Sequence, residues 1–295
     1  MKKIIVLLLI AILAVFALSA CGDNGEAVGN NSDVAAVDDY FIWDSFDSGK
    51  IVGYSEEGLK QKVIKIPEEC TSITVGVLSE NTTVEEIYFT ENIELTQYMF
   101  MDCTALKYVE LPSGLESIPA SCFSGCSSLV EVDIPDTVTE ISDDAFFKCT
   151  SLKEMNLNDC ITRIGDDAFA FCENLENVNI PSNIETIGDY AFAYNFKLNP
   201  VTYPHGLKEI GEWAFYSCDK FSKVVLPESL EELGTMAFSY CDNLTEIYLP
   251  ASLDSIAVSS FGQEDHVIDV YVKEGSAADI QYETYGDSLM VKKYY

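Results

Sequence analysis

The sequence predicts an α/β solenoid, in which short coils stack around one continuous core. Three observations predict it: an apolar residue followed by proline recurs every 23 residues, phenylalanine and cysteine recur at fixed distances after that proline, and an alternating apolar and polar stretch closes each repeat. A unit this small cannot bury a core alone, whereas stacked units can. The chain is therefore predicted to be a repeat protein.

The proline lattice sets the register of the coils. Its points are Pro112, Pro135, Pro181, Pro204, Pro227 and Pro250, with Asn158 at the vacant point. Backward extension gives Thr90, through a repeat that is one residue short, and then Pro67; forward extension gives Lys273. About nine coils of 23 residues are therefore predicted over residues 67–272.

Positions counted from the proline indicate which side chains form the core. Position plus eleven is Phe100, Phe123, Phe146, Phe169, Phe192, Phe215, Phe238 and Phe261, and plus fourteen is Cys103, Cys126, Cys149, Cys172, Cys218 and Cys241. Both sets are expected to point inward. Alternation such as Val132-Asp133-Ile134 predicts one short strand per coil in a parallel sheet. On the other face, the stretch Asp143-Asp144-Ala145-Phe146-Phe147 predicts a helical or 3-10 turn, with its acids at the N-terminal end.

The recurring pattern, illustrated by residues 134–152 (IPDTVTEISDDAFFKCTSL), resembles BspA-type leucine-rich repeats. The first repeat departs from it, with Leu78 and Asn81 in place of Phe and Cys, and so does the last, with Glu264 at the Cys position. Terminal repeats commonly diverge. Asn195, which stands at the Cys position of an internal repeat, is interpreted as an asparagine substitute in the cysteine ladder. The resemblance implies a non-enzymatic surface protein associated with adhesion to host or matrix proteins and with contact between bacteria.

The two flanks of the array resemble the closing segments of such proteins. Residues 39–66 resemble a hairpin-like opening segment and are predicted to be an N-terminal cap. Residues 273–295 are predicted to be a C-terminal cap, with a short helix near Ala277 to Tyr285 and a final strand near Leu289 to Val291. Caps cover the exposed edges of a solenoid, which would otherwise pair with other chains.

The N-terminus is typical of an export signal, because Lys2 and Lys3 precede an apolar run over residues 4–17. The sequence Leu18-Ser19-Ala20-Cys21 resembles the lipobox of bacterial lipoproteins, which implies a signal peptide over residues 1–20 and a lipidated Cys21. The alternative is ordinary secretion with a chance cysteine. Residues 21–38 are predicted to be a flexible acidic tether. The expected location is the extracellular face of the cell membrane or the cell surface, with the membrane contacted only through the lipid.

Composition excludes several functional classes. The 295 residues include 49 acidic and 17 basic side chains, a formal net charge of −32, which argues against nucleic-acid binding because phosphates would be repelled. The sequence has two histidines, His205 and His266, and contains neither a phosphate-binding glycine motif nor HExxH. We therefore predict no enzymatic activity, no catalytic residues and no cofactor.

Acids and cysteines offer two further kinds of candidate site. Aligned acids occur at Asp143-Asp144, Asp166-Asp167, Asp189 and Glu212, but Ca²⁺ needs six to eight converging oxygens, so no metal site is predicted. The ladder cysteines are predicted to be buried free thiols rather than disulfides, and Cys122 is expected in the core. Cys70 and Cys160 lie off the ladder and could be reactive.

The outward residues of the strands, at plus nineteen and plus twenty-one, form the candidate binding surface on the expected concave face. They are Tyr88, Tyr108, Glu110, Glu131, Asp133, Glu154, Asn156, Asn177, Asn179, Lys223, Glu246, Tyr248, Asp269 and Tyr271. Tyrosines lie at both ends, acids in the N-terminal half and amides in the middle. This composition suits a basic patch on a protein partner. The alternative is that these are merely soluble residues of high β-propensity.

Two functions remain open from the sequence. The first is a lipid-anchored surface protein whose repeats bind a host, matrix or bacterial partner, either a protein or a glycan. The second is a cell-envelope scaffold or a solute-capturing lipoprotein. We adopt the first as the prediction and keep the second as the alternative. The tether tempers the first, because about 17 residues reach only roughly 50 Å when fully extended, too short to cross a thick cell wall.

Overall fold

The computed structural model describes residues 40–89, 93–254, 267–285 and 290–295. The predicted signal peptide, Cys21 and the tether to residue 38 lie outside the described residues, as do Thr90, Phe261, Glu264 and His266. The described residues all belong to one unit, residues 36–295, which is described by itself.

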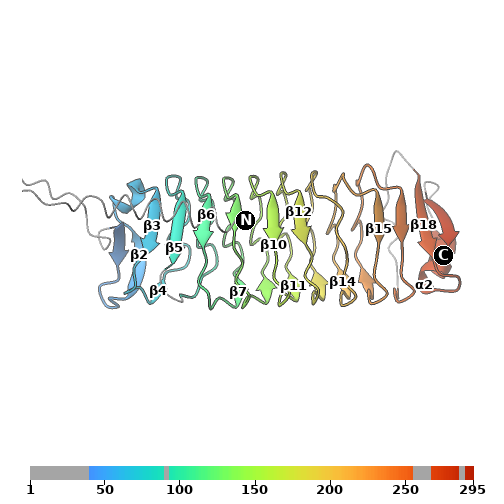
Figure 1. Cartoon of the computed structure of the whole chain (residues 1–295), viewed down its shortest axis with the longest axis horizontal. Helices are drawn as coiled ribbons and strands as arrows, with labels where there is room; N and C mark the ends of the chain where they lie inside the picture. Colours follow the sequence, from blue (N-terminus) through green and yellow to red (C-terminus); the bar gives the residue numbers. More distant parts are fainter. Residues whose placement is uncertain (1–39, 90–92, 255–266, 286–289) are drawn as a thin grey trace, which may run out of the picture. The chain divides into compact units, whose positions relative to one another are not determined.

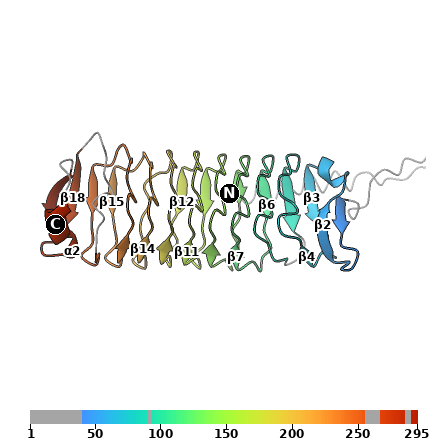
Figure 2. The ribbon, with the colours of Figure 1, turned by 180° about the vertical axis from the view of Figure 1, so that it is seen from behind.

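This unit is a parallel β-solenoid of about ten turns over its described residues. Figures 1 and 2 show the successive coils side by side. The strand assignments give two short strands to most of the described coils. The pairing register advances by 23 residues per coil, as in Ile164 with Ile187 and Met155 with Val178. The lattice that the prolines predict is therefore confirmed.

The strands that the alternation predicts form the first sheet, whose outward surface we call the strand face. They are β3 (Val63–Ile66), β5 (Glu86–Phe89), β6 (Tyr108–Glu110), β8 (Glu131–Val132), β10 (Glu154–Asn156), β12 (Asn177–Asn179), β15 (Lys223–Val225), β17 (Glu246–Tyr248), β18 (Ile268–Val272) and β19 (Met290–Tyr294). The pairing is continuous within three groups, β3-β5-β6-β8, β10-β12 and β15-β17-β18-β19. Between β12 and β15 a whole strand is missing, and Pro200 takes its first outward position. Proline has no N–H to give to a neighbouring strand, which accounts for the break.

A second sheet runs along the coils at plus five and plus six, where the sequence analysis expects no strand. Its members are β4 (Ser72–Ile73), β7 (Ser117–Ile118), β9 (Glu140–Ile141), β11 (Arg163–Ile164), β13 (Thr186–Ile187), β14 (Glu209–Ile210) and β16 (Glu232–Leu233). The strands from β7 to β16 are paired in one six-stranded sheet. Two-residue strands are too short to show a period in the sequence, so they were not predicted.

The expected helical or 3-10 turns of the coils are wrong in the described repeats, and the α/β description is corrected accordingly. Residues 142–149 form turns in which every second N–H group donates its hydrogen bond to the next coil rather than within its own coil. The N–H of Phe147 donates to the carbonyl of Asp144 within the coil at 3.0 Å, but those of Phe146 and Lys148 donate to Ala168 and Ala170 of the next coil at 2.8 and 2.9 Å. A helix would keep all of these bonds within one segment.

Two positions in each turn, plus nine and plus thirteen, adopt the left-handed backbone conformation. Asp144 has φ 56° and Lys148 has φ 58°, and every positive-φ residue other than glycine in the described chain lies at one of these two positions. This conformation is uncommon for residues with a Cβ. It is held here by hydrogen bonds between coils rather than by glycine.

The phenylalanine ladder fills the core as predicted. The seven described members, from Phe100 to Phe238, are completely buried. Phe169 stacks on Phe146 and Phe192 with ring centroids 5.2 and 5.3 Å apart and an interplanar angle of 7° in each case. Each ring is therefore packed between those of the two neighbouring coils.

The cysteine ladder is buried and unbonded, as predicted. Its six cysteines are free thiols, and Cys149 Sγ donates to the carbonyl of Phe123 at 3.2 Å. Asn195 does the same through Nδ2, at 2.9 Å from the carbonyl of Phe169, which confirms it as a substitute in the ladder. Burial raises the pKa of Cys172 to about 12 and also raises that of Cys70, which disfavours the reactive thiolate at neutral pH. Cys160 is exposed.

The ends of the described unit hold its other elements. An antiparallel hairpin, β1 (Phe41–Trp43) and β2 (Lys50–Tyr54), precedes the 3-10 turn η2 (Gly58–Lys60). The helix expected near residue 277 is α2 (Ala277–Tyr285), and the expected final strand is β19. No helix among the described residues is long and apolar enough to span a membrane.

Candidate binding surface

The residues predicted for the binding surface share the strand face. The residues between them, such as Val109 and Met155, are buried, whereas the predicted ones are exposed or half-buried. Parallel register aligns them across coils, as in Glu154 with Asn177 and Tyr248 with Tyr271. The surface is therefore a set of adjacent side-chain rows on a rigid sheet.

At the N-terminal end of the strand face, Tyr88 and Tyr108 lie side by side, with ring centroids 5.7 Å apart. Tyr88 Oη donates to Glu86 Oε2 at 2.7 Å. Burial, together with Glu110 and Asp133, raises the pKa of Tyr108 to about 12. Both phenols are neutral and offer flat apolar area with a polar tip.

The acids next to this pair are not neutralised. Glu110, Glu131 and Asp133 are exposed, and none of them has an ion-pair partner in the described part of the chain. The N-terminal half of the strand face therefore combines two tyrosine rings with uncompensated negative charge.

The amides in the middle are exposed, but two of the three side chains are hydrogen-bonded to neighbouring coils. The side-chain amide of Asn179 is hydrogen-bonded to the neighbouring coil. Its Nδ2 donates to the carbonyl of Leu157 at 2.7 Å, and its Oδ1 accepts from the N–H of Leu157 at 2.8 Å. Asn177 Oδ1 accepts from Asn199 Nδ2 at 3.0 Å. Asn156 is exposed.

The C-terminal tyrosines form a separate cluster. Tyr248 and Tyr271 stack with centroids 4.2 Å apart and an interplanar angle of 1°, and Tyr295 meets Tyr248 edge-on at 5.7 Å. Lys223 Nζ lies 4.3 Å from the centroid of Tyr248 and 3.2 Å from Glu246 Oε2. Lys293 forms an ion pair with Asp269. Because the chain's own lysines balance these acids, this cluster is nearly neutral. Six coil spacings of about 4.8 Å put it about 30 Å from Tyr108.

The aligned acids have a structural role that the sequence analysis missed. Asp143 Oδ1 accepts from the N–H of Asp166, and Asp166 Oδ1 from that of Asp189, each at 3.0 Å. Asp189 continues the ladder to Glu212 at 2.6 Å. These acids therefore join coils to one another, rather than cap helices. The described residues contain no group of three or more His, Cys, Asp or Glu side chains arranged for a metal ion.

A row of half-exposed aromatic rings on the turns was also missed, and we call it the turn strip. It consists of Phe147, Phe171, Tyr190, Tyr194, Phe196, Trp213, Tyr216 and Tyr240. Its members occupy variable points of the repeat, which an analysis based on recurring residues passes over. The available signal was the run of aromatic residues at plus nine and plus thirteen between residues 171 and 240.

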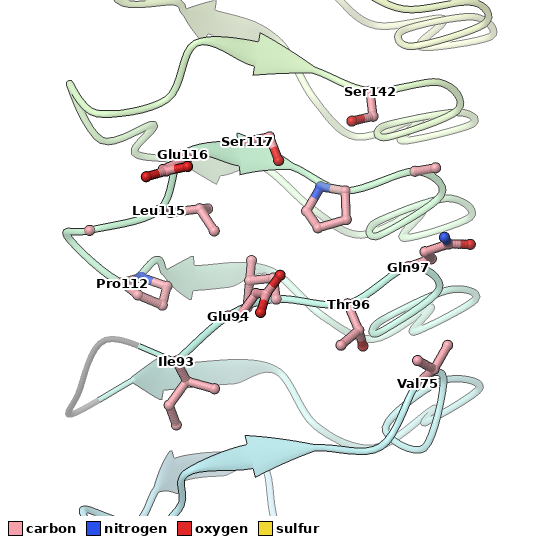
Figure 3. Close-up of a pocket in the computed structure, with 14 residues that line it drawn as sticks. Val75, Ile93, Glu94, Thr96, Gln97, Pro112, Leu115, Glu116, Ser117 and Ser142 are labelled. Atoms are coloured by element: carbon pink, nitrogen blue, oxygen red, sulfur yellow. The ribbon is translucent and has the colours of Figure 1, made fainter.

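A hollow of about 750 Å³ opens where the short repeat interrupts the second sheet (Figure 3). Glu94 and Leu95 occupy the place where other coils have a strand, and no described residue bridges β4 and β7 there. The lining is mixed: Ile93 and Leu115 lie near Glu94 and Glu116. Thr96 Oγ1 is buried at this wall and has no hydrogen-bond partner among the described residues.

Comparison with known families agrees with this geometry. The family profile described as BspA type Leucine rich repeat region, in six copies, matches residues 54–103, 93–212 and 162–292. The chain belongs to the BspA-type leucine-rich repeat family. Repeats of this kind generally act as non-enzymatic scaffolds for protein interaction. A search of curated protein sequences gave no significant match.

Solved structures similar to this BspA-type protein are bacterial. A leucine-rich repeat protein from Bacteroides ovatus is 19% identical, with 87% of this chain and 97% of that chain covered and a TM-score of 0.51. The leucine-rich repeat protein of T. pallidum is 22% identical over 70% of this chain and 88% of that chain, with a TM-score of 0.52. A leucine rich cell surface protein from Faecalibacterium prausnitzii is 18% identical over 93% and 96%, with a TM-score of 0.49. At this level of identity the first two likenesses show the fold of the BspA-type protein.

Proposed function

We propose that this BspA-type protein is a non-enzymatic, exported bacterial lipoprotein whose strand face binds a basic patch on a host, matrix or bacterial protein. One observation carries the proposal: Glu110, Glu131 and Asp133, exposed and without ion-pair partners in the described chain, lie beside the paired rings of Tyr88 and Tyr108.

Each part of this surface has a separate physical task. Tyrosine rings bury a large area at a small cost in side-chain entropy, so they supply affinity. The acids attract a basic partner from a distance and mainly raise its association rate, an effect that salt weakens. The C-terminal tyrosine cluster is neutralised by Lys223 and Lys293, so it contributes apolar contact with little charge selectivity.

The test is a binding screen of the purified protein against host, matrix and bacterial surface proteins and glycans. For a protein that binds, Tyr88→Ser with Tyr108→Ser is expected to weaken binding at least tenfold, mainly through faster dissociation. Glu131→Gln with Asp133→Asn is expected to slow association and to flatten its dependence on salt. The matched control is Tyr240→Ser, an exposed tyrosine of the turn strip. Binding only to glycans, equal loss in the control, or no saturable binding would refute the proposal.

Anchoring through Cys21 has its own test in bacteria that express the whole chain. The protein is expected to incorporate a labelled fatty acid and to sediment with membranes, and Cys21→Ser is expected to abolish both properties. A labelled Cys21→Ser variant, or an unlabelled wild-type protein in the medium, would contradict a lipid anchor.

The hollow beside β7 favours a second candidate, a lipoprotein that captures a solute. Its volume lies within the range of small-molecule sites, and its lining combines apolar side chains such as Leu115 with polar ones such as Glu94 and Gln97. Native mass spectrometry would detect a retained small molecule. We expect Ala120→Trp, which fills the hollow, to lose it, with circular dichroism as the folding control. If the wild-type protein, after incubation with cell extract, showed only the mass of the protein without a bound molecule, this candidate would be contradicted.

A further inference from the structure

A shallow hollow of about 370 Å³ lies on the turn strip, on a different surface from the strand face. Its walls are four half-exposed rings and two carboxylates, from Phe147, Phe171, Tyr190, Tyr194, Asp144 and Asp167. Phe171 and Tyr194 stack with centroids 4.3 Å apart and an interplanar angle of 14°. The hollow therefore has flat aromatic faces and negative charge together.

Hydrogen bonds between coils fix the backbone beneath these rings. The N–H of Phe171 donates to the carbonyl of Ala193 at 2.9 Å, and the N–H of Tyr190 donates to the backbone carbonyl of Glu212 at 2.8 Å. Tyr190 also stacks on Trp213, with centroids 5.6 Å apart. The rings are held in place before any partner arrives, which lowers the entropy lost on binding.

The two carboxylates are not ion-paired in the described part of the chain. Neither Asp144 nor Asp167 has a hydrogen-bond or ion-pair partner for its carboxylate in the described part of the chain. The pKa of Asp167 is raised to about 6 by burial and by the neighbouring Asp144, Asp166, Asp189 and Asp143. Burial and neighbouring acids also raise the pKa of Asp144. A cation in the hollow would relieve this repulsion.

A lysine of the chain itself already packs its ammonium group against two of these rings. Lys148 Nζ lies 4.8 Å from the ring centroid of Phe147 and 5.7 Å from that of Phe171, within the range of a cation–π interaction. The ring faces at this edge of the hollow therefore already hold one ammonium group.

We propose that the hollow binds a lysine or arginine side chain from a basic segment of a partner protein, seated against Phe171 and Tyr194 and paired with Asp144 and Asp167. Charge complementarity selects this occupant, because a neutral or anionic ligand would leave the two carboxylates uncompensated. The proposal is independent of the strand face, so either site could be present without the other.

The probe is an acetylated and amidated tetra-arginine peptide, with tetra-citrulline as its neutral counterpart. Trp213 belongs to the strip, so its fluorescence reports binding there, and Trp43→Phe removes the other tryptophan. We expect saturable quenching by the arginine peptide and at least tenfold weaker binding of the citrulline peptide. Asp144→Asn with Asp167→Asn should weaken binding about tenfold. Asparagine tolerates the left-handed backbone at both positions, so the fold is kept.

Two further measurements distinguish binding at this hollow from non-specific attraction of a cationic peptide to an acidic protein. The strand-face variant Glu131→Gln with Asp133→Asn should leave the fluorescence titration unchanged. Binding by the wild type should weaken as the pH falls from 7.5 to 5.5, because protonated Asp167 no longer attracts a cation, and Asp167→Asn should reduce this dependence. Absence of quenching, equal binding of the two peptides, equal loss in the strand-face variant, or quenching by a neutral oligosaccharide alone would overturn the proposal.

Discussion

Removal of one ring from the phenylalanine ladder is expected to destabilise the solenoid strongly. Phe169 is completely buried and stacked between Phe146 and Phe192, so Phe169→Ala leaves a cavity in the middle of the array. Buried Phe→Ala substitutions cost about 3–5 kcal/mol. The upper part of this range applies because hydrogen bonds between coils resist collapse into the cavity, as in Phe146 N–H to Ala168 and Phe169 N–H to Ala191, both 2.8 Å.

The measurement is equilibrium unfolding in urea, followed by far-ultraviolet circular dichroism and by tryptophan fluorescence. Coincident transitions from the two probes would establish the two-state behaviour that a free energy requires, which long repeat arrays do not always show. Phe196→Ala is the control, since 40% of Phe196 is exposed, and it should cost less than about 1 kcal/mol. A loss below about 1 kcal/mol for Phe169→Ala would refute the stacked core.

Three other predictions concern a glycine between coils, the asparagine of the cysteine ladder and an acid of the turns. Gly188→Ala would place a Cβ 2.7 Å from the backbone N of Asp166, so it should lower the free energy of unfolding by more than about 2 kcal/mol in the same urea assay. The control is Gly206→Ala, which should be nearly neutral because the nearest atom to its Cβ would be 3.5 Å away. Asn195→Cys should leave stability unchanged or raise it slightly. Asn195→Leu should cost about 1–3 kcal/mol, because the carbonyls of Phe169 and Phe192 lose their side-chain donor. Equal stability of the two variants would contradict the ladder role. The raised pKa of Asp167 means that the folded state holds its proton more tightly than the unfolded state, so folding loses stability as the pH rises from about 4 to 6. After allowance for solvent screening, Asp167→Asn should gain up to about 1 kcal/mol at pH 7 and nothing near pH 3, measured by thermal unfolding; an unchanged difference across pH would contradict this.

The parts of the fold that the sequence predicts are those with a repeating packing requirement. Phe123, Phe146 and their equivalents recur because every coil needs the same ring in the same place. The outward rows of the strand face follow from the same register. Asn195 was assigned correctly because its position, rather than its residue type, identified its partner.

The parts that were missed depend on hydrogen bonds between coils, which leave little trace in one repeat. Asp143-Asp144 is a typical helix start, yet Asp143 binds the next coil through its side chain and Asp144 turns the backbone left-handed. The strand at Glu140–Ile141 has two residues and shows no alternation. The hydrogen bonds of Asn179 to the backbone of Leu157 are likewise contacts between coils, which the residue type alone does not indicate.

The aromatic residues of the turn strip are not explained by stability alone. A left-handed residue with a Cβ costs roughly 1–2 kcal/mol, and a ring pair such as Phe171 with Tyr194 returns about 0.5–1.5 kcal/mol, so the two terms nearly cancel. Phe171→Asn should therefore change the free energy of unfolding by less than about 1 kcal/mol while it removes a wall of the hollow. Urea unfolding beside the peptide titration would separate the two effects. A large loss of stability would show that the strip is structural; unchanged stability with weakened arginine binding would show that the rings serve a partner.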